Sequence, residues 1–298
     1  MTAAGLPTMR QLIDGATAVL AEAGVPSPRH DALALAAYCL GIPHLELALA
    51  PAVTPELVTE MTEVVERRRR REPLQQIVGY TVFRYVTLRM APEVFVPRPE
   101  TEVVAGAAID ELIRLERSGG GPLLAVDLCT GSGAIACAVD TETTARVIAV
   151  DASPQAVAIA RANLGAVGKH PMRVEVGDVR DDALLADLDG RVDVVVANPP
   201  YIPPDAVPTD PEVRDHDPDL ALYGGGADGL ALPAAVVRAA ARLLRPGGLL
   251  VMEHADVQGE GSRALAEASR AFTEVSTGTD LTGRDRYLQA RRTQQAST

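Results

Sequence analysis

The most informative segment of the chain is Val192-Asp-Val-Val-Val-Ala-Asn198-Pro-Pro-Tyr201. Its β-branched and small apolar residues predict a strand that is buried on both faces of a sheet. The strand must end at the two prolines, because proline donates no backbone hydrogen bond and restricts the residue before it. We therefore expect Asn198 at the carboxyl end of a central strand, where open α/β sheets bind their ligands.

The last four residues of this stretch combine unusual hydrogen-bonding groups. The Asn198 side-chain oxygen and the Pro199 carbonyl are two acceptors, and neither proline has an N–H group that competes with them. The Tyr201 ring can cover a flat group. We interpret these residues as a site that accepts both N–H bonds of a planar NH2 group and leaves its lone pair facing outward. The alternative is an ordinary turn in which Asn198 caps the strand.

The composition limits the classes of function. The chain has 298 residues and is 47% hydrophobic, which is enough for two domains with a substantial core. The formal net charge of −12 argues against a broad phosphate-binding surface, because duplex binding depends mainly on lysine and arginine. The three cysteines form no CxxC pair and no zinc-ligand pattern, so we expect neither a disulfide nor a metal. Without a membrane-spanning run or a signal pattern, a cytoplasmic location is expected.

Residues 1–72 are expected to form a small helical domain. Apolar residues recur at helical spacing, and Thr8 and Thr54-Pro55 are typical helix starts. The densest positive charge is Arg67–Arg71. We interpret it as a solvated helix end, and contact with RNA or an acidic partner is the alternative.

Residues 73–99 carry alternating β-formers and predict a β-hairpin linker. Residues 100–298 then alternate between strand and helix patterns, which predicts an α/β domain with a seven-stranded, mostly parallel sheet and helices on both faces. The expected strands are 123–127, 147–151, 174–176, 192–197, 249–253, 272–276 and 287–290.

The turn after the first of these strands is rich in glycine. Gly131 and Gly133 let the backbone pass close to a ligand, and a helix begins directly behind them. Asp151 ends the second strand, where a carboxylate can accept both ribose hydroxyls of an adenosine. Asp178 follows the third strand and is expected near the adenine edge, with a helix cap as the alternative. These features leave the cofactor open, because Gly131-Ser-Gly-Ala-Ile-Ala136 also fits a dinucleotide fingerprint.

Asn198-Pro-Pro-Tyr201 distinguishes between the cofactors. Hydride transfer has no use for two acceptors around an amine, whereas methyl transfer to an amide or exocyclic NH2 group does. Together with Asp127-Leu-Cys-Thr-Gly-Ser-Gly133, this motif resembles the S-adenosylmethionine-dependent amino-methyltransferases. Two further segments are similar to the HemK/PrmC family of peptide chain release factor glutamine N5-methyltransferases. They are Arg71-Glu-Pro-Leu-Gln-Gln-Ile-Val-Gly79 and Val94-Phe-Val-Pro-Arg-Pro-Glu-Thr-Glu102.

The resemblance, which covers nearly the whole chain, implies a Rossmann-like class I methyltransferase fold. It implies methyl transfer from S-adenosyl-L-methionine, which becomes S-adenosyl-L-homocysteine, to the glutamine in the Gly-Gly-Gln loop of class 1 release factors. No metal, stable nucleic-acid partner or membrane is implied. The chain departs from the family at Cys129, where glycine is usual. If the backbone there has a positive φ, we expect strain of roughly 1 kcal/mol or more.

The expected site residues fall into two groups. Asn198 and Pro199 are the expected catalytic residues, and they share the substrate pocket with Pro200 and Tyr201. We also expect the loop Pro203–Tyr223 to shape the mouth of that pocket, with a disordered surface loop as the alternative. The expected cofactor-binding residues are Cys129, Thr130, Gly131, Ser132, Gly133, Asp151, Asp178, Val179 and Asn198.

Three other functions remain open at this point. A nucleic-acid amino-methyltransferase acting on adenine N6 or guanine N2 needs base flipping and a basic groove, for which only Arg67–Arg71 offers charge. An NAD-dependent oxidoreductase rests on the glycine fingerprint alone. A non-catalytic adapter would bind release factor through the helical domain.

Overall fold

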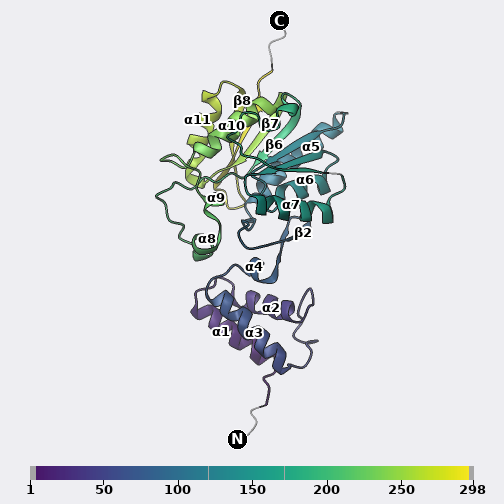
Figure 1. Cartoon of the computed structure of the whole chain (residues 1–298), viewed down its shortest axis with the longest axis vertical. Coiled ribbons are helices and arrows are strands. Elements are labelled where there is room, and N and C mark those ends of the chain that lie inside the picture. Colours follow the sequence, from purple (N-terminus) through teal and green to yellow (C-terminus); the bar gives the residue numbers. More distant parts are fainter. Residues whose placement is uncertain (1–4, 120, 171, 295–298) are drawn as a thin grey trace. The chain divides into compact units, whose positions relative to one another are not determined.

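The computed structural model describes residues 5–119, 121–170 and 172–294, which form two compact units (Figure 1). The first unit runs to Tyr80 and also includes Pro208–His216. The second unit takes Thr81–Val207 and the chain from Asp217 onward. The chain therefore leaves the second unit after Val207 and returns to it nine residues later. Within the described residues, no helix is long and apolar enough to cross a membrane.

The first unit is helical, as predicted. Thr8 caps the first helix, because its hydroxyl accepts a hydrogen bond from the Gln11 backbone while the Gln11 side chain accepts one from the Thr8 backbone. Fully buried side chains such as Ile13, Leu35 and Met61 fill the space between the helices. The helices are α1 (Met9–Glu22), α2 (Pro28–Cys39), α3 (Pro55–Arg69), α4 (Leu74–Val78) and α8 (Pro211–His216).

The predicted hairpin consists of β1 (Tyr80–Phe83) and β2 (Val86–Arg89). Its side chains alternate between buried and exposed, and Phe83, Val86 and Leu88 join the main core of the second unit. This alternation is the period-2 pattern that the sequence shows.

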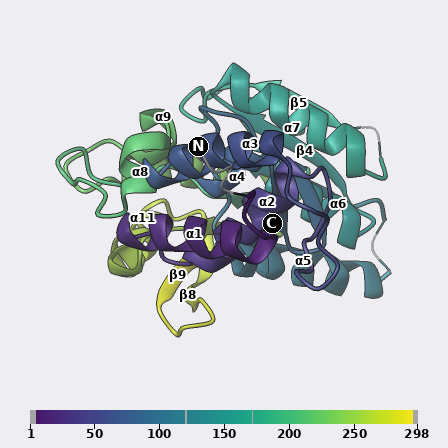
Figure 2. The ribbon, with the colours of Figure 1, turned by 90° about the horizontal axis from the view of Figure 1, so that it is seen from below.

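The second unit contains the predicted seven-stranded sheet, in the order β5-β4-β3-β6-β7-β9-β8. The first five of these strands are parallel, and β9 pairs antiparallel with both β7 and β8. Figure 2 shows the β8–β9 pair in yellow. The strands are β3 (Leu124–Leu128), β4 (Arg146–Asp151), β5 (Arg173–Val176), β6 (Val192–Ala197), β7 (Leu244–Glu253), β8 (Phe272–Thr279) and β9 (Asp285–Arg292).

Strand β6 is the central strand that the opening stretch predicts. All six of its residues are buried, and it pairs with β3 on one side and β7 on the other. Strand β7 begins five residues earlier than the sequence indicates. The reason is that Leu244 already pairs with Val192 of β6, and the register shifts between Val192 and Val194. Pro246, Gly247 and Gly248 therefore lie inside the strand.

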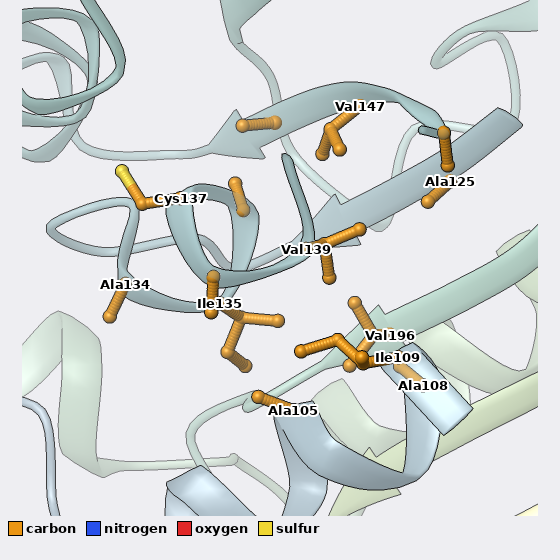
Figure 3. Close-up of a cluster of buried hydrophobic side chains, with 14 of the residues drawn as sticks. Ala105, Ala108, Ile109, Ala125, Ala134, Ile135, Cys137, Val139, Val147 and Val196 are labelled. Atoms are coloured by element: carbon orange, nitrogen blue, oxygen red, sulfur yellow. The ribbon is translucent and has the colours of Figure 1, made fainter. Parts of the chain in front are cut away.

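Helices cover both faces of this sheet. One core cluster joins alternate strand residues to α5 (Thr101–Arg117), α6 (Ala134–Glu142) and α7 (Pro154–Val167). Figure 3 shows Ile109 of α5 next to Val196 of β6 within this cluster. The other cluster joins the remaining strand residues to α10 (Ala231–Leu243) and α11 (Gly259–Ala268). Three short helices, η1 (Ala186–Leu188), α9 (Asp219–Leu222) and η2 (Asp256–Gln258), lie in the connections.

Candidate active site

The site residues gather at the carboxyl edge of the sheet. The chain runs outward from β3 to β5 and then returns to β6, so the strand order reverses between β3 and β6. Such a reversal opens a crevice for a ligand in α/β sheets. Ala197 of β6 pairs with Leu128 on one side and with Met252 on the other. Asn198 therefore leaves the sheet at the same edge as Cys129 and Glu253.

The loop after β3 has three residues with positive φ. They are Cys129 at 59°, Gly131 at 55° and Gly133 at 82°. A Cβ atom on Gly133 would lie 3.2 Å from Ala160 of α7, so glycine permits the close approach there. A Cβ atom on Gly131 would meet nothing within 4 Å, so the loop has open space above it. Cys129 has the left-handed backbone for which we expect strain in a residue other than glycine.

A buried carboxyl holds this loop in shape. Asp127 accepts hydrogen bonds from the Thr130 hydroxyl at 2.5 Å and from the Ala136 backbone N–H at 3.1 Å. Burial raises the pKa of Asp127 to about 7. Burial also raises the pKa of the Cys129 thiol, and nearby carboxylates such as Asp151 add to this rise, so the thiol is neutral. Asp127 is a supporting residue beyond the predicted set, although a carboxyl that ends a buried strand is itself a signal in the sequence.

Asp151 connects the second strand to the same loop. Its Oδ2 accepts a hydrogen bond from the Gly131 backbone at 2.8 Å, and its Oδ1 accepts one from the Ser153 backbone at 2.9 Å. Burial raises the pKa of Asp151, and these backbone hydrogen bonds oppose the rise. Each carboxylate oxygen has a second lone pair, so Asp151 can still accept hydrogen bonds from a pair of hydroxyls.

Asn163 of α7 is a supporting residue that the sequence analysis missed. Its Nδ2 donates to the Ser132 carbonyl at 2.8 Å and to the Arg89 carbonyl at 3.1 Å, and its Oδ1 accepts from the Arg89 backbone. The side chain thereby joins the loop to strand β2. No local pattern marks it, because asparagine inside a helix is usually solvent-facing, whereas this one is buried.

Asp178 and Val179 follow β5. The Asp178 carboxylate accepts a hydrogen bond from the Arg180 backbone at 2.8 Å and forms an ion pair with its guanidinium at 2.6 Å. This neighbour lowers the pKa of Asp178. The local bond to a backbone N–H belongs to a turn, and within the described residues no helix begins at Asp178. Val179 is buried among apolar side chains that include Val150 and Leu184.

Asn198 is oriented by a residue far away in the sequence. Its Nδ2 donates a hydrogen bond to the Thr101 hydroxyl at 3.2 Å. Among the residues that the structure describes, no group donates a hydrogen bond to its Oδ1. The amide therefore has its donor end engaged and its acceptor end available. Pro199 and Pro200 beside it are buried.

Tyr201 is held at both its ring and its backbone. Its hydroxyl donates to Glu253 Oε1 at 3.4 Å, and its carbonyl accepts a hydrogen bond from the Gln258 side chain at 2.9 Å. A Cβ atom on Gly229 would lie 2.2 Å from that carbonyl, so a glycine-rich turn packs directly against it. Burial raises the pKa of Tyr201 and raises that of Glu253 to about 7. Glu253 and Gln258 are thus two further residues of the site that are not among the predicted ones.

The basic run of the first unit is engaged in ion pairs. Arg68 is buried and lies 2.7 Å from Asp31 and 2.8 Å from Glu212. Arg71 donates two hydrogen bonds to Glu212. The other three arginines pair with Glu66 or Glu72. The run is therefore neither a simple solvated helix end nor an unpaired basic surface.

Comparison with known proteins assigns the family. Residues 11–79 match the model of the PrmC N-terminal domain, and residues 123–293 match that of a methyltransferase domain. The release factor glutamine methyltransferase of Bifidobacterium longum is 44% identical over 289 residues, which covers 93% of this chain and 97% of the relative. The chain belongs to the release factor glutamine methyltransferase family. The family and the fold that the sequence predicts are thus confirmed.

Two further members extend this relationship. The release factor glutamine methyltransferase of Streptomyces coelicolor is 47% identical over 281 residues and covers 93% of this chain and 95% of the relative. A 4-amino-L-phenylalanine/4-methylamino-L-phenylalanine methyltransferase of Streptomyces pristinaespiralis is 41% identical over 282 residues and covers 93% of each protein. The name of this relative thus states a small aromatic amine as substrate.

Proposed function

We propose that this protein transfers the methyl group of S-adenosyl-L-methionine to the side-chain amide nitrogen of the glutamine in the Gly-Gly-Gln loop of class 1 release factors. The observation that carries the proposal is the orientation of Asn198, whose donor end is bound to Thr101 while its acceptor end is available. A primary amide presents two N–H donors and therefore needs acceptors. Family membership supports the release factor as the protein that carries this amide.

The cofactor is proposed to bind along the edge formed by β3, β4 and β5. Residues Cys129–Gly133 would pass under its amino-acid part, and Asp151 would accept its ribose hydroxyls. Asp178 and Val179 would lie beside its adenine. The open space above Gly131 and the remaining lone pairs of Asp151 suit such a ligand. When bound, it supplies an electrophilic methyl group on a sulfonium.

The residues of the Asn198–Tyr201 tetrad would act mainly by positioning. Asn198 Oδ1 and the Pro199 carbonyl would accept the two N–H bonds of the glutamine amide and so fix the direction in which its nitrogen lone pair points. The same two oxygens favour the positive charge that develops on nitrogen. The Tyr201 ring covers the amide plane and excludes water. The methylated nitrogen would then be strongly acidic, and its surplus proton would pass to solvent water as the product leaves, so no dedicated base is needed.

We further assign substrate recognition to the helical region 1–72 and methyl transfer to residues 100–298, which residues 73–99 join. The reaction would take place in the cytoplasm, where release factors act. A nucleic-acid substrate is disfavoured because each arginine of Arg67–Arg71 has a carboxylate partner. Within the described ranges there is no candidate metal site, because no group of three or more His, Cys, Asp or Glu side chains is placed so that it could hold an ion.

A small arylamine is the second candidate substrate. The relative from Streptomyces pristinaespiralis, 41% identical, is named for 4-amino-L-phenylalanine and its methylamino form. An arylamine also presents a planar NH2 group to a pair of acceptors. The Asn198–Tyr201 tetrad alone therefore does not distinguish the two substrates, and the rest of the pocket must.

The deciding experiment offers these substrates in parallel. The protein is incubated with methyl-labelled S-adenosylmethionine and one of four acceptors, namely release factor, a release factor with alanine in place of the loop glutamine, 4-amino-L-phenylalanine, or ribosomal RNA. We expect label on the unaltered release factor alone, located on the glutamine by mass spectrometry. Label on the amine or on RNA, with none on the glutamine, would overturn the proposal.

A further inference from the structure

An asparagine side chain has two ends of nearly the same shape but of opposite hydrogen-bonding character. Only the Oδ1 end of Asn198 can accept an N–H bond from a substrate amide. If the side chain were reversed, the NH2 group of Asn198 would face the NH2 group of the substrate amide, and two donors would oppose each other. A catalytic role for Asn198 therefore requires that something in the protein fixes which end faces the substrate.

The group in contact with the Asn198 amide is the Thr101 hydroxyl, 3.2 Å from Nδ2. Thr101 begins helix α5 and is only 3% exposed, so water does not compete strongly at this position. A hydroxyl by itself does not select an orientation, because it can either accept from Nδ2 or donate to Oδ1. Its preference depends on where its single hydrogen points.

Glu253 supplies the missing direction. It ends strand β7, beside β6, and is 2% exposed. Its Oε2 is a buried acceptor to which no group in the described part of the chain donates with normal hydrogen-bond geometry, so it can take the Thr101 hydrogen. Burial raises the pKa of this carboxyl, and the Thr101 hydroxyl opposes that rise. Tyr201 donates to the same carboxyl at 3.4 Å. With its hydrogen directed to Glu253, Thr101 offers Asn198 only lone pairs.

We propose that Thr101 is a positioning residue whose hydroxyl, oriented by Glu253, turns the acceptor end of Asn198 toward the substrate amide. This inference rests on the proposed function. It gives a physical role to the threonine of Pro97-Arg-Pro-Glu-Thr101, a segment that lies 97 positions from Asn198 in the sequence. Thr101 itself touches neither substrate nor cofactor in this account.

The test compares Thr101→Val, which keeps the shape but removes the hydroxyl, with Thr101→Ser, which keeps the hydroxyl. We expect Thr101→Val to lower kcat on release factor by about 10- to 100-fold, because much of the enzyme then presents the wrong end of Asn198. KM for release factor and Kd for S-adenosylmethionine should stay within about twofold. Thr101→Ser should recover at least half of the wild-type kcat.

The matched control is Thr143→Val, which removes another buried hydroxyl of the second unit. Thr143 lies at the end of α6, and its hydroxyl donates to the Val139 carbonyl. This variant should keep the wild-type kcat. Wild-type activity is measured first, so a failure of the proposed function shows itself as an inactive wild type and is distinguished from a failure of this inference.

Three results would overturn the inference in the presence of an active wild type. They are a kcat of Thr101→Val within twofold of wild type, an equal loss in Thr101→Ser, and a loss explained by weaker cofactor binding. Should Thr101→Val not fold, Glu253→Gln addresses the same point. The glutamine amide of that variant can donate a hydrogen bond to the Thr101 oxygen, which leaves the Thr101 hydrogen able to point at Asn198. We therefore expect kcat to fall about tenfold at pH 8. An unchanged kcat would contradict the role.

Discussion

The Glu212 carboxylate lies 2.8 Å from the Arg68 guanidinium, although the two residues are separated by most of the methyltransferase sequence. Arg71 bonds to the same carboxylate. Burial raises the pKa of Glu212, but the hydrogen bonds from these arginines outweigh it and lower the pKa to about 2. Glu212, which belongs to the first unit, is thus held within it by two arginines of the basic run.

Glu212→Gln should therefore destabilise the first unit. Removing the charge leaves Arg68 buried with Asp31 as its remaining carboxylate partner, and breaking a buried pair costs about 3 kcal/mol. Urea unfolding monitored by circular dichroism measures the change. Asp215→Asn is the matched control on the same helix, because its ion pair with Arg214 is exposed and its loss should leave the free energy of unfolding unchanged. Equal effects of the two variants would contradict the role of Glu212.

Cys129→Gly should raise stability. The cysteine has a φ of 59°, where an L side chain is strained and glycine is not. We expect a gain of roughly 0.5–1 kcal/mol in the free energy of unfolding. Cys129→Val should lose stability instead, because a β-branched side chain is the least tolerant of this backbone. Thermal unfolding of both variants checks the order, and a glycine variant less stable than wild type would contradict the strain.

Stability should increase as the pH falls from about 7 to about 4.5. Burial raises the pKa of both Asp127 and Glu253 to about 7. The unfolded chain has ordinary carboxyl values near 4, so between about pH 4.5 and 7 the folded state binds more protons than the unfolded state. The folded state therefore loses stability as the pH rises through this window, by roughly 1.4 kcal/mol for each unit of pKa shift.

Glu253→Gln isolates one of these two contributions. The variant should show a shallower dependence of the melting temperature on pH than the wild type, because Glu253 no longer contributes and Asp127 is the one of these two carboxyls that still titrates. A dependence that is unchanged by the substitution would mean that Glu253 remains charged throughout.

The sequence predicts the elements of this fold well because each depends on local pattern. Strand β6 follows from a run of apolar residues ended by two prolines, and the Thr8 cap follows from residues three positions apart. The family resemblance likewise rests on contiguous motifs. Strain at Cys129 could be predicted only on the condition that its φ is positive, because the sequence does not reveal the sign of φ.

The supporting contacts of the site could not be predicted in the same way. Thr101 meets Asn198 across 97 residues, and Asn163 meets Arg89 across 74. Such pairs arise from how helices pack on the sheet, which no short-range pattern encodes. The basic run shows the same limit, since Arg68 and Arg71 find Glu212 only in the folded chain.

The Asn198→Ala variant tests whether the Asn198 oxygen accepts an N–H bond of the substrate amide. Methylation of the release factor glutamine is followed by mass spectrometry for this variant and the wild type, with melting temperature and S-adenosylmethionine affinity as controls for the fold. We predict a loss in kcat of about 10³-fold in a protein that remains folded. Turnover close to that of the wild type would contradict the account.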